Sequence, residues 1–526
     1  MQVQELDTTV IDYINEIKSN YERQIHKLKI DAIEYQNKYL EIKERYDLLI
    51  YKRFVRSAEQ IPVDQKQGLL FIEEEGKSET QAQDEGPDNQ QEYTEVKSHS
   101  RKKKGRKALD PNLKRVEKII DIPEEEKTCA CGALLTKIGE QTSEKLVIIP
   151  QQIFVEKTIR PKYACHSCEG TEEEGHTVHI APVEPSMIPK SIASASLLSW
   201  ILIAKFEDHI PYYRQEGQFQ RIGVTISRQD MSNWQQQVYQ RLAPLFDLMK
   251  ATVKSGPVIQ MDETVVQVMG EEGRKDTQQS RMWLARWGPP GKTVLWYEYH
   301  ETRGAYHAIE FLSGYSGYLQ TDGYEGYDSA VKGNNQIIHV GCFAHARRKF
   351  FEASKISEKP RSAEQGIKYI RRLYNLEDKL RSENLDDEKF LAQRKVLAAP
   401  ILADFKAWLL KRRDQVPATR LLGIAIHYTL DQWDKLIAYL ESPYLTPDNN
   451  ACENAIRPFV IGRKNWLFCK SPDGAKSSCG MYSLIETAKQ NDIVPAYYLT
   501  ALFEKAPFAS SQKDWEKLLP WNIFTP

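Results

Sequence analysis

The chain has 526 residues, of which 41% are hydrophobic and 28% are charged, and its formal net charge is −1. A chain of this length is expected to fold as several domains, and a near-neutral balance does not by itself indicate a nucleic-acid partner. It has no run of about 18 apolar residues, so we expect no membrane span, and its first residues lack the layout of a signal peptide. These features predict a cytoplasmic protein whose eight cysteines are reduced.

Residues 1–55 are expected to form one long helix. Residues 8–54 contain no proline or glycine, and side chains recur every seven residues at Ile14, Tyr21, Leu28, Tyr35, Ile42 and Leu49. A sustained heptad pattern is typical of a coiled coil, which predicts a homo-oligomer. A long amphipathic helix docked on its own protein is the alternative.

Residues 56–115 are predicted to be a disordered linker. Residues 72–95 carry nine acidic groups and one lysine, whereas "RKKKGRK" at 101–107 has six basic residues in seven. Such composition cannot bury a core. The basic run could be a nucleic-acid-binding arm or a solubilising patch.

Residues 116–182 contain two close pairs of cysteines around strand-like runs such as "QIFVEKTIRPKYAC". Two such pairs can hold one zinc ion tetrahedrally, and the ion would stabilise a segment too small for a large core. The predicted ligands are Cys129, Cys131, Cys165 and Cys168. The first pair has an unusual one-residue spacing, His166 is a possible substitute, and reduced cysteines without metal are the alternative. The remaining cysteines are interpreted as packing residues, namely Cys342, Cys452, Cys469 and Cys479.

Residues 190–250 are expected to be helical and to include a helix-turn-helix. Gly223 would end one helix and Ser227 would cap the next, whose buried face is predicted to hold Met231, Trp234 and Val238. The outward side chains Arg228, Gln229 and Asn233 are of types that reach base edges. Two ordinary helices of an all-α domain would give the same pattern.

Residues 256–351 show three strands, a helix and further strands, an order found in the ribonuclease H-like fold. Asp262 interrupts the apolar run of the first strand, and Asp322 ends a later strand before Gly323. In that fold the two positions lie side by side, and an acid from a later helix, here Glu453, completes the group. Three converging carboxylates would repel unless divalent cations neutralise them, and oxygen ligands favour magnesium or manganese. Taken singly, each acid could instead be a turn residue or half of an ion pair.

Seven stretches resemble one protein family in matching order, from about residue 105 to the end. They are "PKYACHSC", "KFEDHIPYYRQEGQFQRIGV", "QMDETVVQV", "GYLQTDGYEGYDS", "GCFAHARRKFFE", "PDNNACENAIRPFVIGRKNWLF" and "MYSLIETAKQN". They are similar to the transposases of bacterial insertion-sequence family sixty-six, a branch of the DDE transposases. The resemblance implies a zinc-binding segment, a helix-turn-helix and a catalytic core in two parts, 256–351 and 446–505, split by a helical insertion at 352–445. Residues 506–526 form the C-terminal tail.

The resemblance further implies a function. Asp262, Asp322 and Glu453 would be the DDE triad, holding two magnesium or manganese ions for cleavage and strand transfer at the terminal inverted repeats of the element. Partners would be those repeats and target DNA, and small accessory proteins of the same element. The protein would then lie in the bacterial cytoplasm, associated with the nucleoid.

Basic and aromatic residues near the triad are candidate DNA contacts, since such residues suit phosphates and unpaired strands. They are His345, Arg347, Arg348, Lys349, Arg457, Arg463, Lys464 and Trp466. Taken singly, each of these residues is explained equally well by ordinary packing or surface charge. The chain departs from the family at Asn454, where arginine is common after the catalytic glutamate. A domesticated, inactive transposase that only binds DNA, and a nuclease that never joins strands, are the rival functions.

The expected fold is therefore multidomain α+β. It comprises an N-terminal coiled coil, a small zinc-binding β segment, a helix-turn-helix and a ribonuclease H-like α/β catalytic core with a helical insertion.

Overall fold

The structure is a computed structural model that describes residues 2–54, 152–164, 178–356 and 360–524. The chain divides into two compact units, one made of Met1–Phe71 with Val183–Pro526 and the other of Ile72–Pro182. Helices and strands are mixed, as expected from the sequence. None of the helices in the described ranges is long and apolar enough to cross a membrane.

The described part of the smaller unit contains a two-stranded antiparallel ribbon. Strand β1 (Lys162–Ala164) pairs with β2 (Val178–Ile180), and the Arg160 guanidinium donates a hydrogen bond of 2.8 Å to the Ala181 carbonyl. The strand expected across "QIFVEKTIRPKYAC" is therefore limited, among the described residues, to its last few positions.

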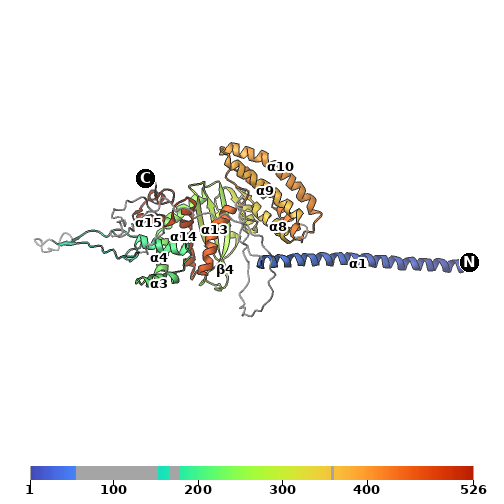
Figure 1. The fold of residues 1–526 in the computed structure, drawn as a ribbon, viewed down its shortest axis with the longest axis horizontal. Coiled ribbons are helices and arrows are strands. Elements are labelled where there is room, and N and C mark those ends of the chain that lie inside the picture. Colours follow the sequence, from blue (N-terminus) through green and yellow to red (C-terminus); the bar gives the residue numbers. More distant parts are fainter. Residues whose placement is uncertain (1, 55–151, 165–177, 357–359, 525–526) are drawn as a thin grey trace, which may run out of the picture. The chain divides into compact units, whose positions relative to one another are not determined.

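A five-stranded mixed sheet forms the centre of the larger unit (Figure 1). Its strands are β3 (Val258–Gln267), β4 (Gln279–Trp287), β5 (Val294–His300), β6 (Gly317–Gln320) and β7 (Ile337–Val340), in the order β5-β4-β3-β6-β7. Neighbours among the first three strands are antiparallel, whereas β6 pairs parallel to both β3 and β7. A parallel pair requires a crossover. Helix α6 (Ala305–Phe311) lies between β5 and β6 in the chain, and α7 (Glu325–Lys332) between β6 and β7.

Edge strand β5 is covered by helix α14 (Pro472–Gln490). The backbone N–H groups of Leu295 and Tyr297 donate to the hydroxyls of Thr487 and Ser483. Small hydroxyl side chains let the helix approach closely and satisfy strand donors that would otherwise be unpaired at a sheet edge.

Further helices surround this sheet. They are α2 (Ala195–Phe206), α3 (Tyr212–Arg221), α4 (Arg228–Arg241), α5 (Ala243–Lys254), α15 (Pro495–Lys505), η3 (Ala506–Phe508) and α16 (Gln512–Lys517). Their apolar faces share one core cluster with the sheet and α14.

A second core lies in the helices inserted between β7 and α13 (Asn450–Trp466). These are α8 (Phe343–Ile356), α9 (Arg361–Ser382), α10 (Asp387–Arg413), α11 (Leu421–Asp431), α12 (Trp433–Ile437) and η2 (Ala438–Glu441). Aromatic rings fill this core, with Phe405 close to Phe350, Tyr369 and Trp433. Helix α8 continues across the boundary expected at 351/352 between the catalytic core and the insertion. Its buried side chains Phe343, Ala346 and Phe350 belong to the core of the insertion.

Helix α1 (Gln2–Phe54) is continuous over 53 residues, drawn in blue in Figure 1. The heptad side chains expected from the sequence are exposed along it, for example Leu28 and Tyr35. Its C-terminal part contacts the insertion, where Lys52 pairs with Glu352 at 2.7 Å and Glu44 pairs with Arg420. The end of α1 therefore docks on its own chain, while most of its apolar stripe lies open.

Candidate metal centre beside the central strands

Asp262 lies in β3, whereas Asp322, expected to end its strand, lies two residues beyond the end of β6, the parallel neighbour of β3. The register pairs Gln260 of β3 with Gln320 of β6, and each aspartate follows its glutamine by two residues. The Gln260 amide donates to the Gln320 side-chain oxygen at 2.8 Å, so both glutamines point to the same face. Because strand side chains alternate, Asp262 points to that face too.

Glu453 reaches this place from the first turn of α13. The Asn449 side chain before that helix donates at 2.9 Å to the carbonyl of Met261, the residue preceding Asp262. The Glu453 side chain is only 5% exposed. Asp448, just before this helix, accepts hydrogen bonds from the backbone and side-chain N–H groups of Asn450.

The three acids share one electrostatic environment. Burial, and then the charges of Glu453, Glu263 and Asp322, raise the pKa of Asp262 well above its usual range. Burial also raises the pKa of Asp322. Burial raises the pKa of Glu453 to about 7, with Asp448 and Asp322 adding to the rise and Arg348 opposing it. Buried carboxylates that have few positive charges near them offer the oxygen ligands that a hard divalent cation prefers.

Glu263 is a further buried acid that sequence reasoning did not single out. Arg303 pairs with one of its oxygens, and the Tyr327 hydroxyl donates to the other at 2.5 Å. Its carboxylate is therefore already satisfied, and we interpret it as support for the strand beside Asp262.

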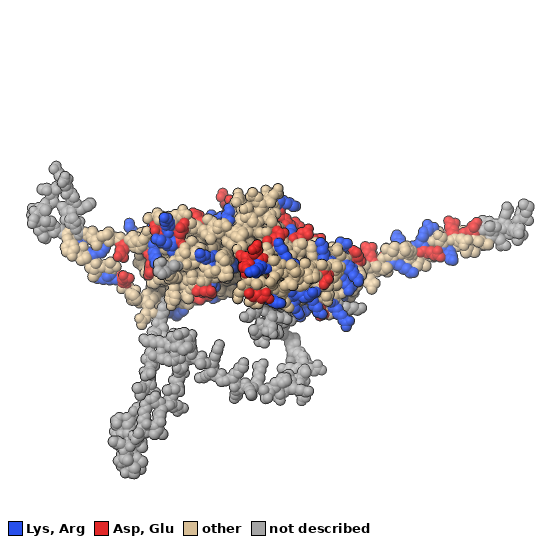
Figure 2. Space-filling view, turned by 90° about the horizontal axis from the view of Figure 1, so that it is seen from above, with Lys and Arg blue, Asp and Glu red and all other residues tan. Residues whose placement is uncertain are grey.

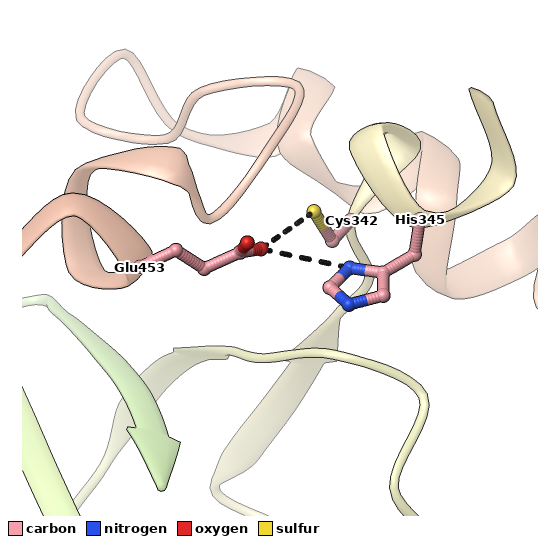
Figure 3. A group of neighbouring side chains, drawn as sticks. All are labelled: Cys342, His345 and Glu453. Atoms are coloured by element: carbon pink, nitrogen blue, oxygen red, sulfur yellow. Dashed lines mark hydrogen bonds and ion pairs between the residues drawn. The ribbon is translucent and has the colours of Figure 1, made fainter. Parts of the chain in front are cut away.

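Helix α8 brings further groups to Glu453 (Figure 3). His345 Nδ1 lies 3.6 Å from Glu453 Oε1, and Arg348 Nη2 lies 3.7 Å from Oε2. Burial, and then Arg348 and Lys349, lower the pKa of His345 to about 3, so its imidazole is neutral at physiological pH. Cys342, interpreted from the sequence as a packing residue, is buried with Sγ 3.9 Å from Glu453 Oε1. The signal that could have found it is the Cys-x-x-His spacing at 342–345.

Comparison with known protein families identifies the chain. A family model described as "Transposase IS66 family" matches residues 190–477, more than half of the chain. The chain belongs to the IS66 transposase family. Three more models match: "zinc-finger binding domain of transposase IS66" at 126–169, "IS66 C-terminal element" at 483–521 and "Transposase C of IS166 homeodomain" at 41–117.

Similar proteins occur in Sinorhizobium fredii (strain NBRC 101917 / NGR234). The uncharacterized protein y4jD is 30% identical over 91% of this chain and 94% of its own length. The uncharacterized proteins y4qI and y4hP are 32% and 29% identical over 80% and 81% of this chain and 77% and 78% of their own lengths.

In this IS66 transposase, the other expected DNA contacts of α8 and α13 have varied surroundings. Lys349 lies over the ring of Tyr428, 4.6 Å from its centroid, and Arg347 and Arg457 are half-buried. Arg463 donates to Thr264 and to the Val265 carbonyl, which links α13 to β3. Lys464 is exposed, whereas Trp466 is half-buried and packs edge-on against Phe459.

Helices α3 and α4 stand where the sequence predicted a helix-turn-helix. Ser227 caps α4 in a reciprocal arrangement with Asp230, and the expected buried face, Met231, Trp234 and Val238, is confirmed. The candidate base-reading residues Arg228, Gln229 and Asn233 are all exposed, and Gln229 donates to Asn233 at 2.9 Å.

The zinc-finger match at 126–169 spans all four expected zinc ligands. These residues, Cys129, Cys131, Cys165 and Cys168, lie outside the described residues. The family match supports zinc binding in this segment.

Proposed function

We propose that this transposase cuts DNA at the terminal inverted repeats of its insertion sequence and joins the freed ends to target DNA. The observation that carries the proposal is that Asp262 of β3, Asp322 just beyond the neighbouring strand β6 and Glu453 of α13 lie near enough for their charges to raise the pKa values of Asp262 and Glu453. The strand order and directions fit a ribonuclease H-like core, in which acids at these places hold the catalytic metals.

Asp262, Asp322 and Glu453 would hold two magnesium or manganese ions. Such ions activate the attacking oxygen and stabilise the leaving oxygen in phosphodiester chemistry. The raised pKa values of the free acids fit this role, because each carboxylate gains most from a cation where burial has removed water. Arg348 beside Glu453 offers a fixed positive charge toward a phosphate.

DNA binding would combine local basic surfaces with the exposed face of α4. The net charge is near zero, yet Lys and Arg side chains gather beside the base of α1 in Figure 2. Local charge of this kind attracts phosphates. Arg228, Gln229 and Asn233 would read bases, and His345, Arg347, Arg348, Lys349, Arg457, Arg463, Lys464 and Trp466 would contact the strand ends.

Other parts of the chain would assemble the complex. The open stripe of α1 would pair copies of the chain, and one structural zinc ion would order residues 116–182. Small proteins of the same element would assist, at the nucleoid.

The test is cleavage of a duplex that carries the terminal repeat, with magnesium. We expect the wild-type protein to cut and join it, and Asp262→Asn and Glu453→Gln to lose both steps while still binding the duplex. Asp247→Asn changes an exposed acid of α5 and serves as the matched control with full activity. Absence of cleavage with any divalent cation would favour a DNA-binding protein without chemistry, and cleavage without joined product would favour a nuclease.

A further inference from the structure

A second group of metal-ligating side chains lies against the carboxylate centre. Ligand atoms of Cys342, His345 and Glu453 all lie within 4.8 Å of one another (Figure 3). Cys342 directly precedes α8, His345 is in its first turn, and Glu453 comes from the first turn of α13. Residues three apart at a helix start share one face, which is why the thiol and the imidazole both point at Glu453.

The separations of Cys342 and His345 from Glu453 are close to those around a tetrahedral zinc ion. Zinc bonds of about 2.3 Å to sulfur, 2.05 Å to nitrogen and 2.1 Å to oxygen place sulfur and oxygen about 3.6 Å apart, and nitrogen and oxygen about 3.4 Å apart. The corresponding distances to Glu453 Oε1 are 3.9 Å from Cys342 Sγ and 3.6 Å from His345 Nδ1. These two distances exceed the tetrahedral values by about 0.3 Å and 0.2 Å.

A neighbouring group already positions Cys342, and His345 Nδ1 is not engaged in a hydrogen bond among the residues that the structure describes. The Asn449 backbone N–H donates to Cys342 Sγ at 3.3 Å. His345 Nδ1 is buried and has no hydrogen-bond partner within the described ranges, and the neutral tautomer with its proton on Nε2 offers an Nδ1 lone pair to a metal. A thiol, an imidazole and one carboxylate favour zinc or cobalt, whereas magnesium prefers oxygen ligands alone.

We propose that Cys342, His345 and Glu453 form a separate site for a thiophilic divalent cation such as Zn²⁺, with its fourth position open. On binding, the Cys342 thiol loses its proton to solvent and the thiolate bonds the metal. Glu453 belongs to both this site and the proposed magnesium centre. A thiophilic ion therefore holds Glu453 toward α8 and inhibits the magnesium-dependent reaction, a consequence that rests on the proposed function.

Cobalt binding tests the site without using the reaction. Full-length protein loaded with one equivalent of zinc at the finger is titrated with Co²⁺, and the thiolate-to-cobalt charge-transfer band is recorded. We expect a band in the wild-type protein and in Asp262→Asn, and no band in Cys342→Ser. Cys479→Ser is the matched control, because Cys479 is also buried but lies in α14 and should keep the band.

A second variant covers the case in which Cys342→Ser does not fold, as judged by circular dichroism. His345→Gln removes one ligand and should weaken Co²⁺ binding by at least the roughly 10-fold seen when even an outer-shell partner is lost. No band at saturating Co²⁺, a band that survives Cys342→Ser, or unchanged affinity in His345→Gln overturns the proposal. None of these results depends on whether the protein cleaves DNA.

Discussion

Arg394 in the helical insertion is expected to position the segment that leads into Glu453. Its guanidinium is fully buried, and it donates to the carbonyls of Tyr439, Ser442 and Leu445 at 2.9–3.0 Å and to Glu377 at 2.7 Å. The chain from Leu445 runs directly into α13. Arg394→Met would keep the volume and remove all four hydrogen bonds.

The loss of stability in Arg394→Met follows from the polar groups that the substitution leaves without a partner. Glu377 would stay buried and keep Arg381 as an ionic partner, and the carbonyls of Tyr439 and Ser442 would lose their charged donor. Breaking a buried ion pair from one side costs about 3–5 kcal/mol. Arg381 keeps part of the network, so we take the lower value, about 3 kcal/mol. At 1.4 kcal/mol per factor of ten, this corresponds to roughly 100-fold easier local opening.

Amide hydrogen exchange measures that opening directly, because it reports the free energy of local unfolding. We expect exchange in α9, α10 and the first turn of α13 to become about 100-fold faster in Arg394→Met, with DNA cleavage reduced in parallel. Arg372→Met is the control: Arg372 and its partner Asp404 lie 3.9 Å apart and are 52% and 63% exposed, so exchange should stay within about twofold. Exchange in Arg394→Met that matches this control would refute the argument.

Three more predictions concern pH, zinc and assembly. Burial raises the pKa of Glu453 from 4.5 to about 7, so between these values the folded protein keeps a proton that the unfolded chain loses. Without magnesium, the free energy of unfolding should therefore fall from pH 5 to pH 7, and Glu453→Gln should remove about 2 kcal/mol of that fall, whereas parallel curves for the two proteins would contradict the prediction. Cys165→Ser should lower bound zinc by one equivalent in elemental analysis and Cys469→Ser should not; equal zinc in both would exclude the finger. Leu28→Glu, on the heptad line of α1, should reduce the mass measured by light scattering, and Lys27→Gln, off that line, should not; unchanged mass in Leu28→Glu would argue against the coiled coil.

The sequence predicted the parts of the centre that depend on local pattern. Asp262 inside the apolar run of β3 and Glu453 in the first turn of α13 lie on the elements expected from the sequence, whereas Asp322 lies two residues beyond the end of β6. Strand alternation and helix starts have short periods, and these are visible in a single chain. The buried face of α4 followed from the same kind of pattern.

The features that the sequence did not predict depend on contacts between segments far apart in the chain. Cys342 comes close to Glu453 across 111 residues, because the insertion closes on itself and returns the chain to β3. Glu263 could not be distinguished from a metal ligand until Arg303 and Tyr327 were found around it. Docking of α1 on its own chain was one of the two expectations for this helix, but its ion pairs through Lys52 and Glu44 could not be predicted, since exposed charges carry no mark of their partners.

The departure at Asn454 can now be judged from where its side chain lies. Asn454 is exposed although Glu453 beside it is buried, because consecutive helix residues point in directions about 100° apart. An arginine at 454 would therefore face solvent or bound DNA rather than the carboxylates. The positive charge at the centre comes instead from Arg348, across from Glu453 on α8. Asn454 thus removes one charge from the surface around the centre and leaves the group of three acids complete.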